Sequence, residues 1–520
     1  MSDRLLTGKV PWDVVAGHVR GPLPPEVVLG PAHGEDAALV RFGNELWAVA
    51  ADPVTFAARG AGRLAVIVNA NDVAVRGAVP RLFLAVVLLA ESDATADRAV
   101  ALLDEIRTTC AELGVGLIGG HTEVAPGIDH SIVCGTMLGP ISDRPITTAG
   151  LRPGDRVGLV RTAGLEGTAI LREAWGKRLA ALHPAGAFPA NEVAADPGTL
   201  LVVQEALAAA ACPAVSALHD VTEGGVGEAL HELGQASGCV IEARREDVPV
   251  LPSTRALCED LGLDPLGLIG SGALLVGCAE GGVRAVEEAL AAVAAPVAWV
   301  GRAHAAQAVV ATLPRFPRDE LLKAGLLARV RALIFDLDGT LVESDYDWPA
   351  IRRELGITEP SIVDALNGLP EPERSRQWTR LEEIEREATA AARLRPGARE
   401  LVTWLRGRGL PCALVTNNTA ENTSSLLSRF GLGFDLVMTR DDGLWKPSGA
   451  PVRAAAHRLG VPIEACAKVG DGRYDVLAGR EAGCGVVALV RLAGYALDPR
   501  PDLVFPDPQA LWRNLLMIHE

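Results

Sequence analysis

The sequence of 520 residues has few lysines, few aromatic residues, no C-x-x-C pair and no apolar run as long as a membrane span. Nine cysteines without zinc spacing, and the absence of an apolar core in residues 1–10, predict a reduced, cytoplasmic protein without a signal peptide. A net charge of −16 argues against nucleic acid and membrane surfaces as partners. With 49% hydrophobic residues, the chain is long and apolar enough for several folded domains.

Two acids directly follow the short apolar run 332–335, in the stretch RALIFDLDGTL. A run that is apolar on both faces predicts a buried parallel strand, and ligands bind where such strands end. Asp336 and Asp338 would repel each other without a cation between them, and Mg²⁺ fits because it prefers oxygen ligands and is commonly shared with a phosphate. A calcium loop is excluded, because Leu341 and Asp347 stand where such a loop requires Gly and Glu.

Two further apolar runs also end in polar residues. These residues are Thr416, Asn417 and Asn418 after the run 411–415, and Asp471 and Asp475 after the run 467–469. Hydroxyl and amide groups can donate hydrogen bonds to phosphate oxygens, and the acids form a second pair. Lys446 lies between these segments in the chain. Because the sequence has only five lysines against 44 arginines, Lys446 is predicted to serve as a compact charge with a specific role.

In this order and spacing, the four segments resemble the motifs of haloacid dehalogenase-like phosphatases, over residues from about 330 to 520. The resemblance implies a Rossmann-like parallel sheet and hydrolysis of small phosphomonoesters such as phosphoglycolate. It also implies that Asp336 is the nucleophile that forms an aspartyl-phosphate and that Asp338 is the general acid and base. By the same resemblance, Thr416, Lys446, Asn417 and Gly339 would bind the phosphoryl group, and Asp336, Asp338, Asp471 and Asp475 would bind Mg²⁺.

The insert 344–395 predicts helices, because apolar residues recur at three- and four-residue spacing among Arg, Glu, Ala and Leu. It resembles the small helical cap that covers the active site of these phosphatases and selects the substrate. Arg352 and Arg353 lie in this insert. They are compatible with a binding site for a second anionic group and equally with a solvated helix face.

The first 315 residues alternate predicted strands and helices and contain short clusters of glycines and acids. The clusters are residues 34–38 (GEDAA), 51–53 (ADP), 69–72 (NAND), 119–123 (GGHTE) and 219–225 (HDVTEGG). Glycines allow a close approach of the backbone and acids hold Mg²⁺, as a nucleoside triphosphate site requires. Each cluster alone is also typical of an ordinary turn.

From residue 6 to residue 322, the order of these clusters resembles the superfamily of aminoimidazole ribonucleotide (AIR) synthetase, thiamine-monophosphate kinase, selenophosphate synthetase and the hydrogenase-maturation carbamoyl dehydratase (HypE). The resemblance implies a two-subdomain α+β module that uses ATP and dimerises through a β-barrel. It also implies Asp36, Asp52 and Asp72 as Mg²⁺–ATP ligands, with Asn71, Gly119, Gly120, His121, Glu123 and Asp220 nearby. His121 departs from the acid of the kinase branch and is either a structural or a catalytic histidine. The HypE branch ends in a cysteine, whereas residues 313–319 here contain no thiol.

The predicted organisation of this α/β chain follows from these segments. Residues 1–140 form an ATP-binding, dimerising subdomain, 141–314 a second subdomain, 315–329 a linker, and 330–520 the hydrolase domain. A homodimer is expected because the apolar stretches 64–68 and 82–90 are difficult for one small subdomain to cover. The expected function is an Mg²⁺-dependent phosphatase for a small phosphorylated metabolite, fused to an ATP-dependent synthetase-like enzyme. The alternative is that the N-terminal module is a non-catalytic platform that senses nucleotide and regulates the phosphatase.

Overall fold

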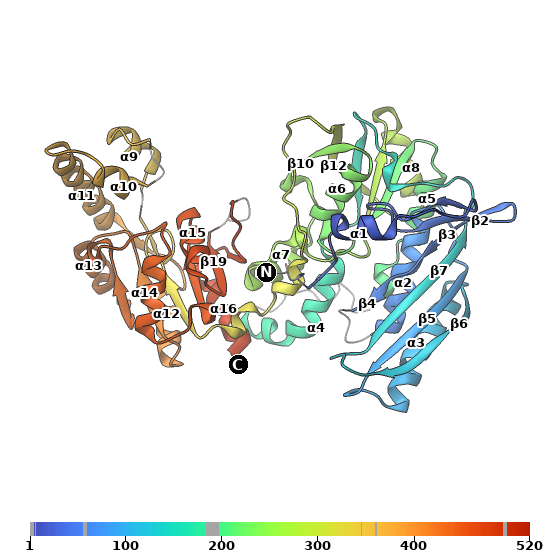
Figure 1. Ribbon diagram of the computed structural model, residues 1–520, viewed down its shortest axis with the longest axis horizontal. Helices are drawn as coiled ribbons and strands as arrows, with labels where there is room; N and C mark the ends of the chain where they lie inside the picture. Colours follow the sequence, from blue (N-terminus) through green and yellow to red (C-terminus); the bar gives the residue numbers. More distant parts are fainter. Residues whose placement is uncertain are drawn as a thin grey trace. The chain divides into compact units, whose positions relative to one another are not determined.

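The computed structural model describes residues 5, 7–55, 60–183, 197–344, 346–358, 361–491 and 497–519 (Figure 1). The chain forms two compact units, residues 1–257 with 265–322, and residues 258–264 with 323–520. The first unit therefore extends to Leu322, beyond the predicted boundary at 314. No helix in the described ranges is long and apolar enough to cross a membrane.

The first unit begins with a seven-stranded sheet in the order β1-β2-β3-β7-β5-β6, with β4 paired to β7. The strands are β1 (Val27–Leu29), β2 (Ala38–Phe42), β3 (Glu45–Ala50), β4 (Pro53–Val54), β5 (Leu82–Ala90), β6 (Gly116–Ala125) and β7 (Ile132–Pro140). All pairings are antiparallel except β5 with β6. Helix α1 (Trp12–Val19) precedes the sheet, and α2 (Ala61–Ala74) and α3 (Ala96–Glu112) pack on it (Figure 1).

The apolar stretch 64–68 lies inside this subdomain and not at an interface. It belongs to α2, which packs against β7, α3 and the following subdomain, so Leu64, Val66 and Ile67 are buried. The stretch 82–90 differs, because alternate side chains of β5 face outward and Val86 is 37% exposed. Beside it, β6 pairs with β5 alone among the described strands and exposes apolar side chains, among them Ile118 at 56%. Only the β5–β6 surface therefore retains the predicted interface character.

The second subdomain of this unit is a five-stranded antiparallel sheet in the order β10-β12-β8-β11-β9. Its strands are β8 (Arg156–Val160), β9 (Val215–Asp220), β10 (Cys239–Ala243), β11 (Leu274–Cys278) and β12 (Val297–Ala305). Its helices are α4 (Leu165–Leu182), α5 (Val203–Ala211), α6 (Gly225–Ala236) and α8 (Val283–Ala291), and α7 (Pro252–Leu261) begins here and ends in the second unit. Both faces of the sheet are apolar, so β11 is buried along its whole length between two helical layers.

The second unit contains a six-stranded parallel sheet in the order β17-β16-β13-β18-β19-β20. The strands are β13 (Ala332–Phe335), β16 (Cys412–Val415), β17 (Leu436–Met438), β18 (Cys466–Gly470), β19 (Val486–Val490) and β20 (Leu503–Phe505). The helices are α12 (Ala398–Gly407), α13 (Ala420–Phe430), α14 (Ala450–Leu459), α15 (Arg473–Ala482) and α16 (Pro508–His519). The buried apolar runs of the sequence are thus parallel strands, as predicted.

The insert predicted as a helical cap forms three helices, which lie in sequence between the two strands of a short ribbon. The helices are α9 (Trp348–Glu354), α10 (Ile362–Asn367) and α11 (Glu373–Ala391), and the ribbon pairs β14 (Val342–Glu343) with β15 (Arg393–Leu394). Figure 1 draws these helices as a separate group beside α13. The cap has its own apolar core, which includes Ile351, Leu355, Leu366 and Leu381.

Candidate active sites

Three predicted phosphatase residues directly follow neighbouring strands of the parallel sheet. Thr416 follows β16, Asp336 follows β13 and Asp471 follows β18. Parallel strands end at the same sheet edge, so these side chains meet there. Asp475 joins them because the first turn of α15 follows Asp471 directly.

Asp336, Asp471 and Asp475 form an acidic cluster in which one carboxylate oxygen of each lies within 4.8 Å of the others. Burial and the charge of Asp475 raise the pKa of Asp336 to about 6. Burial and both neighbouring charges raise the pKa of Asp471 to about 7. Part of each rise comes from repulsion between the carboxylates, and a divalent cation would relieve that repulsion. The cluster therefore fits Mg²⁺, for which these three residues supply hard oxygen ligands.

Lys446 is the cation that faces this cluster. Its Nζ lies 2.7 Å from Asp336 Oδ1 and 2.7 Å from Asp475 Oδ1. Burial disfavours its charge, but the two carboxylates outweigh burial and raise its pKa. Asn417 holds the Lys446 backbone from both sides, since its Nδ2 donates to the Lys446 carbonyl at 2.8 Å and its Oδ1 accepts from the Lys446 N–H at 2.8 Å. The Asn417 side chain, predicted to bind the phosphoryl group, thus holds the Lys446 backbone in place.

Lys468 is a second lysine of the site, which the sequence analysis assigned only to the strand. Its side chain is fully buried, with Nζ 2.7 Å from Asp475 Oδ1 and a hydrogen bond of 2.9 Å to the Val469 carbonyl. Burial disfavours ionisation of Asp475, yet the two lysines outweigh it and hold the pKa of Asp475 well below its usual range. The available signal was a lysine inside the apolar strand β18 of a lysine-poor chain.

Asp338 lies apart from the acidic cluster and has different partners. Its carboxylate accepts from Ser344 Oγ at 2.6 Å and from Asn418 Nδ2 at 3.0 Å. Burial raises its pKa, which favours the protonated form that a general acid requires. Gly339 follows with φ +76°, and a Cβ there would collide with the Asp471 carboxylate. Glycine is therefore required both by the backbone and by the metal-ligand candidate beside it.

The first unit contains a strongly acidic cavity of about 670 Å³, which Asp36, Asp52 and Asp72 line. Asp72 is 2% exposed, and its Oδ2 has no hydrogen-bond partner. Burial, together with the charges of Asp52 and Asp220, raises the pKa of Asp72 well above its usual value. A buried carboxylate oxygen without a partner among other acids fits a cation, and Asp52 and Asp72 are the side chains that would hold Mg²⁺ with ATP.

Asp36 has protein partners that the sequence analysis missed. Arg76 Nη2 donates to Asp36 at 2.7 Å, and His219 Nδ1 lies 3.0 Å from it. His219 Nε2 lies 3.3 Å from Glu232, and although burial disfavours the charged ring, Asp36 and Glu232 raise the pKa of His219 to about 10. Without a metal ion, His219 thus serves as a counter-ion to Asp36 and Glu232, while one ligand atom each of Asp36, His219 and Asp220 lies close enough to the others to hold a metal ion.

Several predicted nucleotide-binding residues lie away from this cavity. Asn71 uses its side chain to bind backbone, since Nδ2 donates to the Leu200 carbonyl at 3.0 Å and Oδ1 accepts from the Val202 N–H at 2.9 Å. Gly119, Gly120, His121 and Glu123 lie on the exposed edge strand β6. His121 Nε2 is 3.2 Å from Glu123 Oε2, and the two side chains are 63% and 53% exposed. Within one subunit, these residues do not line the cavity.

The segment 313–319, which lacks the cysteine of the HypE branch, forms part of the cavity wall. Phe316 is 2% exposed, and its N–H donates to Glu228 Oε2 at 2.8 Å. A Cβ at Gly227 or Gly267 would collide with its ring. Asp319 accepts from the Gly224 N–H at 2.7 Å. Residues 313–319 are thus fixed on the first unit.

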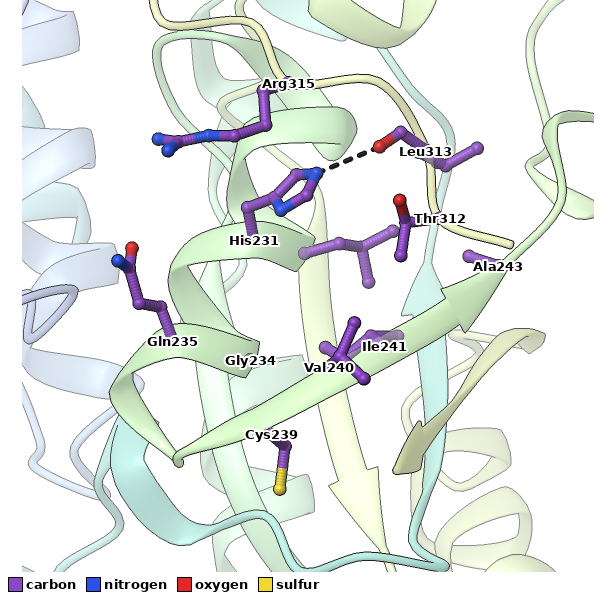
Figure 2. Close-up of a pocket in the computed structure, with 11 residues that line it drawn as sticks. His231, Gly234, Gln235, Cys239, Val240, Ile241, Ala243, Thr312, Leu313 and Arg315 are labelled. Atoms are coloured by element: carbon purple, nitrogen blue, oxygen red, sulfur yellow. Dashed lines mark hydrogen bonds between the residues drawn. The ribbon is translucent and has the colours of Figure 1, made fainter. Parts of the chain in front are cut away.

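A second cavity of the first unit, of about 200 Å³, lies between α6, β10 and residues 312–315 (Figure 2). In Figure 2, His231 points towards the Leu313 carbonyl, to which its Nε2 donates at 2.9 Å. Gln235 and Arg315 line this cavity and also the acidic one. Because its lining contains no acid, it offers no Mg²⁺ ligands, and the acidic cavity remains the candidate nucleotide site.

Comparison with protein families identifies both halves of the chain. Residues 34–141 and 152–313 match the N-terminal and C-terminal domains of AIR synthase related proteins. Residues 330–483 match the haloacid dehalogenase-like hydrolases. The chain therefore belongs to the AIR synthase-related proteins in its N-terminal half and to the haloacid dehalogenase-like hydrolases in its C-terminal half, as predicted.

Curated relatives of both kinds were found. Carbamoyl dehydratase HypE of Escherichia coli is 31% identical over 246 residues, which cover 46% of this chain and 68% of that protein. HypE of Rhodobacter capsulatus is 31% identical over 286 residues, 53% of this chain and 79% of that protein. An uncharacterised hydrolase of Saccharomyces cerevisiae is 30% identical over 188 residues, 34% of this chain and 86% of that protein. Among solved structures, HypE in complex with ATP has a TM-score of 0.44 and 26% identity and covers 52% of this chain and 80% of that chain.

Proposed function

We propose that the second unit is an Mg²⁺-dependent phosphatase that acts through an aspartyl-phosphate on Asp336. The observation that carries this proposal is the convergence of Asp336, Asp471 and Asp475 with Lys446 at one edge of the parallel sheet. Mg²⁺, when bound by the three acids, would screen the charge between Asp336 and a phosphate dianion. Small phosphorylated metabolites of the phosphoglycolate type are the proposed substrates.

The proposed reaction has two steps. The Asp336 carboxylate attacks phosphorus, the bond from phosphorus to the leaving oxygen breaks, and Asp338 donates its proton to that oxygen. Asp338, now a carboxylate, then takes a proton from a water molecule, which attacks the phosphoryl group and releases inorganic phosphate and Asp336. Lys446 and Thr416 hold the phosphoryl oxygens during both steps.

The test of this function is the variant Asp336→Asn. It should abolish hydrolysis of p-nitrophenyl phosphate while the circular dichroism spectrum stays unchanged. Asp338→Asn should lose most activity, because general acid–base catalysis commonly contributes ~10²–10⁴-fold. EDTA should silence the wild type and excess Mg²⁺ should restore it, whereas Glu400→Gln, on the exposed face of α12, should have no effect. Turnover by Asp336→Asn would refute the assignment.

For the first unit we propose ATP-dependent chemistry in the acidic cavity, with Asp52 and Asp72 as Mg²⁺ ligands. Asp72 is more than nine-tenths buried, and its Oδ2 has no hydrogen-bond partner. Both observations support a cation at this position. The alternative is a nucleotide sensor without turnover. The full chain carrying Asp336→Asn separates the two, because its phosphatase is disabled. Release of ADP or AMP from ATP would support an enzyme, and ATP binding without turnover for any offered acceptor would support the sensor.

We further propose that this unit forms a homodimer through the β5–β6 surface. The exposed edge strand and the apolar side chains Ile118 and Val124, which are 56% and 53% exposed, support this interface. We also propose that the two units act in sequence, because they are joined in one chain. A phosphorylated product of the first unit could be the substrate of the second. Phosphate released in a burst from ATP and acceptor, and lost in Asp336→Asn, would support coupling. Equal release from both proteins would oppose it.

A further inference from the structure

A buried ion pair joins the cap to the catalytic sheet. Arg440, which begins the short helix after β17, binds Glu385 of α11 through two parallel hydrogen bonds, Nη1 to Oε1 at 2.6 Å and Nη2 to Oε2 at 2.8 Å. Both side chains are 6% exposed. The guanidinium also lies over the Trp378 ring of α11, 4.9 Å from its centroid. A bidentate, stacked arginine recognises one geometry and not merely a charge.

The same arginine holds the phosphate-binding loop. Its Nη1 donates to the Asn417 carbonyl at 3.4 Å, and its backbone N–H donates to the Asn418 carbonyl at 3.2 Å. Asn417 in turn fixes the backbone of Lys446 through two hydrogen bonds of 2.8 Å. A continuous series of contacts therefore runs from Glu385 on the cap to the Lys446 ammonium group beside Asp336.

Other contacts also join the cap to the sheet domain near the site, since Ser344 donates to Asp338 at 2.6 Å and Arg352 donates to the Tyr474 hydroxyl, next to Asp475, at 3.3 Å. Arg429 at the end of α13 donates to the Thr389 and Ala390 carbonyls of α11 at 3.2 and 3.0 Å. Trp445 Nε1 donates to Asp364 of α10 at 2.8 Å. The cap is covalently tied to the sheet domain near the two-residue strands of the β14–β15 ribbon. A short ribbon suits a cap that moves, because only two chain segments join the cap covalently to the sheet domain.

We propose that Glu385 and Arg440 form a latch, a positioning pair through which the seated cap holds Asn417 and Lys446 in the geometry that binds a phosphoryl group. The inference rests on the proposed phosphatase function. Entry of a substrate requires the cap to open, which separates Glu385 from Arg440 and releases the loop. Closure re-forms the pair and restores Lys446, so a small substrate that fits under the closed cap is favoured over a bulky one.

The test compares Glu385→Gln with the wild-type full chain on phosphoglycolate and on p-nitrophenyl phosphate. Gln keeps the shape of the side chain and loses the charge of the pair. We expect kcat/KM for phosphoglycolate to fall by about tenfold or more, which corresponds to ~1.4 kcal/mol, while the bulky aryl ester loses less. Arg440→Lys, which keeps the charge and loses the fork, should behave in the same way. The matched control is Glu354→Gln, which breaks an exposed cap ion pair with Arg380, 2.6 Å long, and should change neither substrate.

Hydrogen–deuterium exchange gives a second readout that does not depend on turnover. The reporter amides are those of Lys446 and Arg440, which donate to Asn417 Oδ1 and to the Asn418 carbonyl. In Glu385→Gln they should exchange faster, together with α11, while β19 stays unchanged. Equal losses on both substrates, or unchanged exchange at the two amides, would overturn the latch. If the wild type hydrolyses no phosphomonoester, the proposed function fails, and the exchange result alone decides the latch.

Discussion

Glu166 in the first turn of α4 should make the first unit less stable as the pH rises. The residue is 5% exposed, and its Oε2 has no hydrogen-bond partner. Burial raises its pKa from 4.5 to about 7, although a hydrogen bond from Ser271 opposes the shift. A carboxyl group whose pKa is raised in the folded state stabilises the fold while it stays protonated. This contribution is lost as the pH rises from the unfolded to the folded pKa.

The magnitude follows from the size of that shift. One pKa unit corresponds to ~1.4 kcal/mol, so ionising Glu166 costs roughly 3 kcal/mol of folding free energy at pH 8 and below about 1 kcal/mol at pH 5. Glu166→Gln removes this cost and keeps a polar group for Ser271. Since ~1 kcal/mol shifts the midpoint of a large domain by roughly 2 °C, the variant should unfold on the order of 5 °C higher at pH 8.

Calorimetry of the full chain at pH 5 and pH 8 measures the effect. The control is Glu173→Gln, which removes an exposed acid from the same helix and should not change the pH dependence. The result that contradicts the reasoning is a parallel pH dependence of Glu166→Gln and wild type. A variant less stable than wild type at pH 8 would also contradict it.

Three other changes have clear expected outcomes. Gly339→Ala should weaken Mg²⁺ activation of phosphomonoester hydrolysis at least about tenfold, because its Cβ would displace Asp471. The control is Gly443→Ala, with φ +77° and no atom within 4 Å of a Cβ, which should lower only the stability. Asp72→Asn should weaken Mg²⁺–ATP binding in isothermal titration and leave phosphatase activity unchanged; equal ATP affinity would remove Asp72 from the site. Ile118→Glu should convert a homodimer into monomers by light scattering, and a wild-type monomer at micromolar concentration would refute the β5–β6 interface.

The candidate site of the hydrolase domain was the part most accessible from the sequence, because its residues follow strands directly. An apolar run that ends in Asp336 or Asp471 predicts a buried strand and places the acid at the carboxyl end of that strand. Because parallel strands end at the same sheet edge, the sequence also predicts that these acids lie near one another. The roles of Lys468 and Arg440 were not predicted, because the neighbouring sequence does not identify the acids that they bind. Each pairs with an acid distant in sequence or on the next helix, and a charged residue in a buried strand or loop reveals only that a partner must exist.

The N-terminal segments were harder to place from sequence, because a glycine cluster or an apolar run is compatible with more than one structure. The cluster around His121 is an edge strand and not a cavity wall in the subunit, since glycine is compatible with both. Helix α2 is apolar on nearly all sides because it is buried on all of them, so the stretch 64–68 required no partner subunit. Arg76, which follows that helix, was the overlooked residue. A fully buried arginine requires acidic partners, and Arg76 binds Asp36 and Glu35.

The two sites balance their acids differently, which sets what each requires from Mg²⁺. In the hydrolase domain, three carboxylates face Lys446 and Lys468, so one divalent cation would be enough to make the cluster attractive to a phosphate dianion. In the cavity, Arg76 and His219 are already engaged by Asp36, Glu35 and Glu232, and Asp72 has no cation within hydrogen-bond reach among the described residues. A triphosphate therefore meets uncompensated negative charge there and must bring its cations with it. Mg²⁺ should consequently activate the phosphatase before any substrate binds, whereas in the first unit it should bind together with ATP.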